Sequence, residues 1–123
     1  MQVEDSIILA KFRNEKTRNE AFNLLLKKYQ QRVYWHIRRM VIDHDDADDL
    51  TQNTFIKIWR SLERFREDAQ LYTWMYRIAT NECITFLNKK KLRAMVSLED
   101  VSDILEDKLQ DNLEVDANHI EYK

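Results

Sequence analysis

The segment that decides the fold is AFNLLLKKYQQRVYWHIRRM, residues 21–40. Its apolar and aromatic positions recur every three or four residues, at Phe22, Leu25, Tyr29, Val33, His36, Ile37 and Met40. Thr17 and Glu20, just before it, have the spacing of a capping box. We therefore predict an amphipathic helix from Arg18 to Val41, about 36 Å long. Such a helix needs other helices to cover its apolar face.

A shorter helix is predicted before this segment, over residues 5–13. It has three apolar residues on one side, Ile8, Leu9 and Phe12. It ends at the polar run Asn14 to Lys16, where we expect Asn14 to adopt the left-handed conformation.

A third helix is predicted from about Asp46 to Leu62, after the acidic run DHDDADD at residues 43–49. Carboxylates are stabilised at the positive end of a helix dipole. The residues expected to face inward are Ala47, Thr54, Phe55, Ile58 and Leu62. A calcium loop is excluded, because its central glycine is missing and Thr54 stands where the closing glutamate is required.

A fourth helix is predicted over AQLYTWMYRIATNECITFLNKKK, residues 69–91, with Asp68 as its cap. The residues expected to face inward are Leu71, Met75, Ile78, Ala79 and Phe86, while Trp74 and Phe65 are candidates for either the core or the surface. Glu82 falls on the buried side and needs a cationic partner, for which we expect Arg38 or Arg39. Cys83 is interpreted as a small core residue.

Composition agrees with an all-α fold. The 123 residues suffice for one domain, and they include no glycine and no proline. No apolar run approaches the roughly 20 residues of a membrane span, the N-terminus is no signal peptide, and a single cysteine suits a reducing compartment. We expect a soluble, cytoplasmic protein.

Charge is distributed unevenly along the chain. Residues 1–95 contain 18 lysines and arginines against 13 aspartates and glutamates, whereas residues 96–123 contain 2 against 9. The basic body is typical of proteins that face a polyanion, although ordinary globular domains can share it. We expect residues 96–123 to form a flexible acidic linker or tail.

Two exposed helix faces are candidates for binding. The third helix turns Asp49, Gln52, Asn53, Ile56 and Arg60 outward, and the fourth turns Thr73, Arg77, Asn81, Ile84, Asn88 and Lys91 outward. Either face can equally be ordinary solvated surface. The basic end NKKKLR can serve only to balance the helix dipole, but three consecutive lysines favour phosphate contact. His36, His44 and His119 lack the spacing of a metal site or a catalytic triad, so we predict no enzyme, metal or cofactor.

The segment DADDLTQNTFIKIWRSLERFREDAQLYTWMYRIATNECITFLNKKK, residues 46–91, together with the helix before it, resembles the extracytoplasmic-function sigma factors of bacteria. The resemblance covers residues 4–95. It implies the N-terminal region-2 domain over residues 1–95, a compact bundle of about four helices. Residues 96–123 would begin the linker to a second domain that this chain lacks. An alternative sigma factor directs transcription initiation by binding core RNA polymerase and by recognising and melting the −10 promoter element.

The resemblance also implies partners and site residues. The clamp helices of the largest polymerase subunit would meet Asp49, Gln52, Asn53, Ile56 and Arg60. The non-template strand of the −10 element would meet Phe65, Arg66, Tyr72, Thr73, Arg77, Asn81, Thr85, Lys89, Lys90, Lys91 and Arg93. Within this set, Phe65, Arg66 and the segment 68–72 would form a pocket for a flipped base. An anti-sigma factor is a further expected partner, and no membrane insertion is expected.

Two other functions fit parts of the sequence. A helical protein-interaction module would share the fold and the exposed Ile56, but it leaves the segment TWMYRIATN and its basic end unexplained. A helix-turn-helix regulator of duplex DNA would need a short helix pair joined by a tight turn, and no such pair is evident.

Overall fold

The computed structural model describes residues 3–67 and 69–109, with side chains as far as residue 100. Within these ranges the chain forms four α-helices and two short 3-10 turns, without a strand. The predicted all-α fold is therefore confirmed. The chain divides into two compact units, Met1–Leu87 and Asn88–Lys123, which are described separately below. None of the described helices has the length and apolar character needed to cross a membrane.

Helix α1 (Asp5–Arg13) has the predicted bounds and buries the predicted residues Ile8, Leu9 and Phe12. The prediction for Asn14 is wrong, because its φ is −93° and no described residue has a positive φ. Instead, the Asn14 side chain accepts a hydrogen bond from the backbone N–H of Lys16 at 3.1 Å. It thereby starts a 3-10 turn, η1 (Glu15–Thr17), and this turn changes the chain direction without a left-handed residue.

The predicted capping box at Thr17 and Glu20 is also wrong. The Thr17 hydroxyl donates at 2.6 Å to the carbonyl of Lys11, at the end of α1, and makes no cap bond to α2. The Glu20 carboxylate pairs with the Lys11 ammonium at 3.1 Å. Both side chains therefore tie α2 to α1, because partners from the neighbouring helix are within reach.

Helix α2 (Arg18–Arg38) places Leu25, Tyr29, Val33 and Ile37 in the core, as its periodicity predicted. It ends three residues before the expected Val41. The Arg38 guanidinium donates to the carbonyl of Val41 at 3.2 Å and to that of Ile42 at 2.7 Å, which stabilises the turn that follows.

Helix α3 (His44–Ser61) begins at the predicted acidic run, two residues earlier than expected. The Asp43 side chain caps it by accepting from the Asp45 N–H at 2.9 Å. The residues predicted to face inward are buried. Thr51 is buried too, and the hydroxyls of Thr51 and Thr54 each donate to the carbonyl four residues earlier at 2.7 Å. A 3-10 turn, η2 (Leu62–Arg64), follows α3.

Helix α4 (Leu71–Leu109) begins two residues later than predicted and continues well past Lys91, where we expected it to end. The predicted cap, Asp68, lies outside the described residues. The chain has no glycine or proline to stop the helix, and residues such as Lys, Leu, Arg, Met and Glu have high helix propensity. The helix therefore includes part of the predicted acidic linker. Residues 110–123 are outside the described part of the chain.

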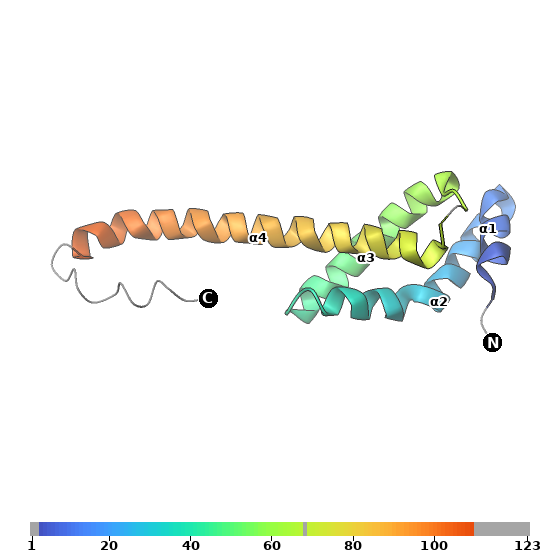
Figure 1. The fold of residues 1–123 in the computed structure, drawn as a ribbon, viewed down its shortest axis with the longest axis horizontal. Helices are drawn as coiled ribbons and strands as arrows, with labels where there is room; N and C mark the ends of the chain where they lie inside the picture. The colour runs from blue at the N-terminus through green and yellow to red at the C-terminus, as the bar shows by residue number, and fades with distance from the viewer. Residues whose placement is uncertain (1–2, 68, 110–123) are drawn as a thin grey trace. The chain divides into compact units, whose positions relative to one another are not determined.

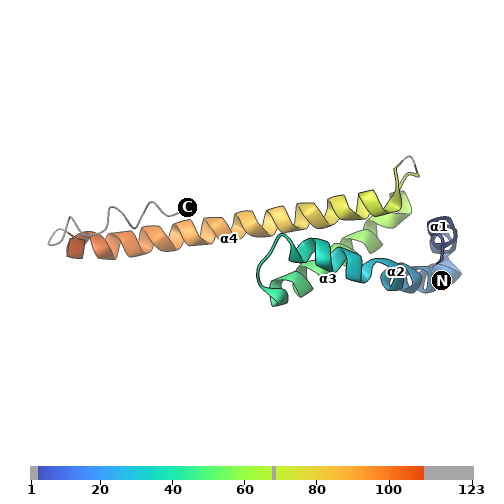
Figure 2. The same ribbon diagram turned by 60° about the horizontal axis from the view of Figure 1, so that its bottom comes forward.

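The core of the first unit lies where α1, α2, α3 and the first turns of α4 meet. Figures 1 and 2 show α1 beside the start of α2, and α2 and α3 diverging from a short connection. Helix α4 contributes the fully buried Met75, Ala79 and Cys83. The partner predicted for Glu82 is wrong. Its carboxylate accepts from the Lys57 ammonium of α3, whereas Arg38 donates to the carbonyls of Val41 and Ile42.

Candidate functional site

The five residues expected on the outward face of α3 are all exposed: Asp49, Gln52, Asn53, Ile56 and Arg60. The Ile56 side chain stands in solvent with 47% of its surface accessible. An apolar residue ringed by a carboxylate, two amides and a guanidinium is a suitable anchor for another protein.

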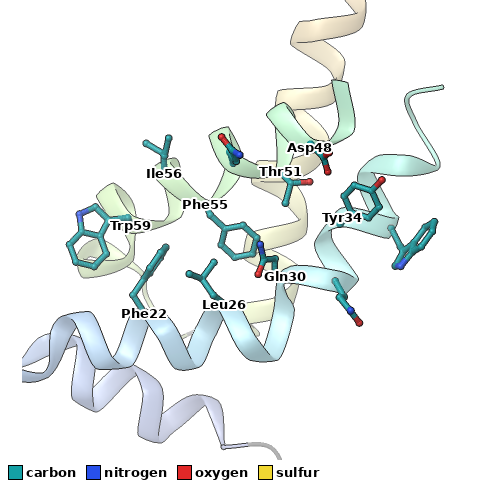
Figure 3. A pocket seen from close by; sticks show the side chains of 12 residues that line it. Phe22, Leu26, Gln30, Tyr34, Asp48, Thr51, Phe55, Ile56 and Trp59 are labelled. Carbon is teal, nitrogen blue, oxygen red and sulfur yellow. The ribbon is translucent and has the colours of Figure 1, made fainter. Parts of the chain in front are cut away.

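A groove of about 940 Å³ between α2 and α3 lies beside this face and includes Gln52 and Ile56 in its lining. Figure 3 shows Phe22 and Leu26 of α2 pointing toward Phe55 and Trp59 of α3. The rings of Phe22 and Trp59 meet edge to face, with centroids 5.1 Å apart. The groove is therefore lined by aromatic rings, and it shares Gln52 and Ile56 with the outward face of α3.

Sequence reasoning missed this groove because it assigned Phe22 to the core. The available signal was a second apolar row on α2, Phe22 and Leu26, four residues apart and offset from the buried row that includes Leu25. Trp59, three residues after Ile56, remains 37% exposed. Two apolar rows on one helix indicate that one row packs in the core and that the other is available to a partner.

The outward face of α4 in the first unit is exposed as predicted. It presents Thr73, Arg77, Asn81, Ile84 and Thr85 to solvent. On the opposite side Leu71, Met75, Ala79 and Cys83 are buried, at intervals of four residues. The buried row fixes the rotation of the helix, so the amide of Asn81 and the guanidinium of Arg77 point away from the core.

The segment before α4 forms a cavity of about 510 Å³ with α1 and α2. From the predicted base pocket it includes Phe65, Ala69, Gln70, Leu71 and Tyr72, whereas Arg66 is exposed and does not line it. Phe65 is only 7% exposed and packs on Trp74, with centroids 4.9 Å apart. Phe65 is therefore a wall of this cavity and a core residue at once.

Sequence reasoning missed the other side of the cavity, which α1 and α2 supply through Asp5, Ser6, Leu9, Tyr29 and Arg32. Periodicity marked Leu9 and Tyr29 only as core positions, and Asp5, Ser6 and Arg32 are ordinary helix-surface types. The three residues of α1 share the cavity with those of α2 because α1 packs along α2.

An aromatic cluster connects the cavity to the α4 face. The ring of Tyr72 lies 4.0 Å from that of Tyr76 and 5.8 Å from that of Tyr29, and the Arg32 guanidinium covers Tyr72 at 4.5 Å. Burial, with a hydrogen bond involving Tyr72, raises the pKa of Tyr76 to about 12. Its phenol therefore stays neutral at physiological pH and donates to the Arg32 carbonyl at 3.1 Å.

The histidines behave differently from one another. His36 is packed, as expected: its ring stacks on Tyr76 at 4.2 Å, and its Nε2 lies 2.8 Å from the Thr80 hydroxyl. Burial, and secondarily the charge of Arg39, lower the pKa of His36. His44 is exposed and lies 3.6 Å from Asp45 and 3.5 Å from Asp48. All three residues are exposed at the start of α3, and we assign no metal to them. His119 is outside the described residues.

The second unit contains the remaining predicted DNA contacts. Lys89, Lys90, Lys91 and Arg93 are exposed, as is every described side chain from Asn88 to Asp100. Four cations within five residues of one helix form a concentrated positive surface.

A protein-family model described as Sigma-70 region 2 matches residues 25–93, more than half of the chain. The chain belongs to the Sigma-70 region 2 family. The family resemblance expected from the sequence is thereby confirmed. The matched range includes most of α2, all of α3 and the start of α4, while α1 lies outside it.

Several relatives are at least 40% identical to this region 2 chain over the aligned residues. RNA polymerase sigma-H factor of Pseudomonas aeruginosa is 49% identical over 61 residues, 50% of this chain and 32% of the relative. ECF RNA polymerase sigma-E factor of Haemophilus influenzae is 42% identical over 74 residues (60% and 39%). The sigma-E factor of Escherichia coli is 40% identical over 86 residues (70% and 44%). The chain thus spans less than half the length of these relatives.

A solved structure with the same fold is an engineered region 2 of sigmaE, determined by NMR in complex with GTAAAA. It is 33% identical to this chain, with a TM-score of 0.65, and the match covers 74% of this chain and 93% of that one.

Proposed function

We propose that this chain is the region-2 part of an extracytoplasmic-function sigma factor, which binds core RNA polymerase and recognises and opens the −10 promoter element. The observation that carries the proposal is the presence of two exposed helix faces of different chemistry on one small core. The α3 face has an apolar anchor beside an aromatic groove, and the α4 face has cationic and amide groups.

The α3 face would bind the clamp helices of the largest polymerase subunit. Ile56 would enter the contact as the apolar anchor, while Asp49, Gln52, Asn53 and Arg60 would set its register around the rim. The groove lined by Phe22, Phe55 and Trp59 extends the apolar area available to the same partner helix. An anti-sigma factor that covered this face would exclude the polymerase, and both events would take place in the cytoplasm.

The α4 face would bind the non-template strand. Arg77 would contact phosphate, and the paired donor and acceptor of Asn81 would meet a base edge, with Thr73 and Thr85 as further hydrogen-bonding groups. The cavity beside Phe65 and Tyr72 is large enough for one base, and Tyr72 presents a ring on which a base can stack. Arg66, exposed next to the cavity, would contact the backbone of the same strand.

In this mechanism no covalent bond forms or breaks. A single strand held on α4, with one base in the cavity, offsets the free energy needed to unstack a few base pairs, and so shifts the promoter toward the open state. Stacking contributes about 1–3 kcal/mol for each base held. The cations at residues 89–93 would add affinity that does not depend on sequence and that falls as salt rises.

A binding comparison tests the proposal. The labelled chain is titrated with a single-stranded non-template oligonucleotide, the matching duplex and a purified clamp fragment. We expect binding to the clamp and stronger binding to the single strand than to the duplex. Clamp binding without any DNA binding would favour a protein-interaction module instead, and stronger duplex binding would contradict the proposed role of the α4 face.

A further inference from the structure

The cavity in front of α4 has a wall that lies outside the matched region-2 residues 25–93. This wall is the N-terminal helix α1, which contributes Asp5, Ser6 and Leu9. Leu9 is buried, while Asp5 and Ser6 add a carboxylate and a hydroxyl to the lining. The polar chemistry of the cavity is therefore determined in part by the N-terminal helix of this particular chain.

Asp5 is held in place by two residues of α2. The Tyr29 hydroxyl lies 2.7 Å from Asp5 Oδ1 and 2.8 Å from Oδ2, and the Lys28 ammonium donates to Oδ1 at 2.7 Å, so three acceptor positions are in use. Lys28 also donates to the carbonyl of Val3 at 2.8 Å, which fixes the start of α1. A carboxylate has about four acceptor positions, so these bonds leave capacity for one more donor. Asp5 is thus a preorganised acceptor at the cavity wall.

Across the same cavity, the charge and the rings favour a flat ligand with both donors and acceptors. The Arg32 guanidinium covers Tyr72 at 4.5 Å and Tyr29 at 5.6 Å, so it lies close to both phenol rings. An ionised carboxylate accepts hydrogen bonds but does not donate them. Cytosine, adenine and guanine each have an exocyclic amino group that can donate to it, whereas thymine has no amino group and its ring N3–H lies between two carbonyl oxygens, which a carboxylate repels.

We propose that Asp5 makes the cavity selective for an unpaired base with an exocyclic amino group, and that it disfavours thymine. This inference rests on the proposed function, because it assumes that the strand delivers a base to this cavity. Here α1 reads the base directly, and the contacts of Asp5 with Lys28 and Tyr29 position its carboxylate. Asp5 is therefore a specificity-determining residue contributed from outside the matched region.

The test measures hexanucleotide binding to the full chain by fluorescence anisotropy. The probes are GTAAAA and its variants, in which each position in turn is C, A, G or T. In the unmodified chain we expect one position where thymine binds about five-fold more weakly than cytosine, the effect of one hydrogen bond. Asp5→Asn offers an amide donor in place of one carboxylate oxygen, so it should reduce this ratio below about two-fold.

Two variants separate base reading from charge and from packing. Glu4→Gln removes the same negative charge one residue away, at an exposed position outside the cavity, and should change affinity for all probes equally. Tyr29→Phe keeps the ring and the Asp5 carboxylate but removes one of the two groups that position this carboxylate, so it should reduce the selectivity less than Asp5→Asn does. If Asp5→Asn keeps the full discrimination against thymine, or if Glu4→Gln reduces it as much as Asp5→Asn does, Asp5 does not read the base and the inference is wrong.

An independent measurement uses the unmodified chain alone. In NMR titration with the preferred hexanucleotide, the backbone amides of Ser6 and Leu9 should shift, and those of Lys11 and Arg13 at the far end of α1 should not. Strong hexanucleotide binding without shifts in α1, or without base selectivity, would overturn this inference and leave the proposed function standing. No hexanucleotide binding at all would overturn both.

Discussion

The outward faces of α3 and α4 have similar exposure but different surroundings. Ile56 on α3 is 47% exposed and Ile84 on α4 is 46% exposed, so accessibility does not distinguish them. Around Ile56 are a carboxylate, amides and an aromatic groove, whereas the predicted α4 face around Ile84 has arginine, asparagine and threonine and no carboxylate. The neighbours of an exposed apolar residue therefore indicate its kind of partner, because their charge and polarity favour the approach of either a protein or a polyanion.

The largest expected effect comes from replacing Ile56 on the α3 face with aspartate. Ile56→Asp should weaken binding to the polymerase clamp by at least about 30-fold, since a central apolar anchor contributes about 2 kcal/mol or more. The same variant should keep its single-strand affinity and its helical circular dichroism. Pull-down with core polymerase, alongside oligonucleotide anisotropy, measures both quantities.

Ile84→Asp is the matched control on the other face. It should leave clamp binding in the pull-down unchanged. It should weaken binding of the single-stranded oligonucleotide, because it adds a negative charge beside Arg77 and Asn81. If both variants lost both activities, the two faces would not be functionally separate. Unchanged clamp binding by Ile56→Asp would contradict the assignment of the α3 face as the surface that binds the polymerase clamp.

A smaller effect is expected from the lysines of the second unit. Replacing Lys89, Lys90 and Lys91 with glutamine should flatten the dependence of log affinity on log salt, by about 0.7 for each single-strand phosphate that is no longer neutralised. The measurement is a series of oligonucleotide titrations at increasing salt. An unchanged slope would show that these lysines do not contact phosphate, and the role of the α4 face in the first unit would then stand alone.

The smallest effect concerns the packing of α2 on α4 through His36. Burial lowers its pKa, so the folded state binds fewer protons than the unfolded state, and stability rises with pH. Its contribution is fully present above the unfolded pKa of about 6.5 and is lost as pH falls below it. His36→Gln should therefore reduce the difference between urea midpoints measured at pH 7.5 and pH 5.5.

His44→Gln is the comparison for this pH experiment, because His44 is exposed at the start of α3 and touches no core residue in the described contacts. It should leave the apolar packing of His36 and Tyr76 unchanged. An equal loss of pH dependence in both variants would mean that burial of His36 is not the cause.

Periodicity predicted which side of each helix is buried and which is exposed. The buried rows of α1, α2, α3 and the start of α4 were recovered because burial repeats every three to four residues, whatever the partner. The helix ends were less predictable. The wrong predictions for Thr17 and Glu20 have one cause, since both side chains bond to Lys11 of α1. The prediction for Asn14 failed for a local reason, because its side chain accepts from the Lys16 N–H and starts a 3-10 turn.

The sequence by itself determined the helical fold, the rotation of each helix and the two candidate faces. These properties follow from local geometry and from the free energy of burying apolar side chains. Only the tertiary structure decided that Lys57 pairs with Glu82, that Phe22 and Trp59 form a groove, and that Asp5 reaches the cavity of Tyr72. Each depends on distances between helices, which no local pattern encodes, because many pairs of side chains are compatible with the same periodicity.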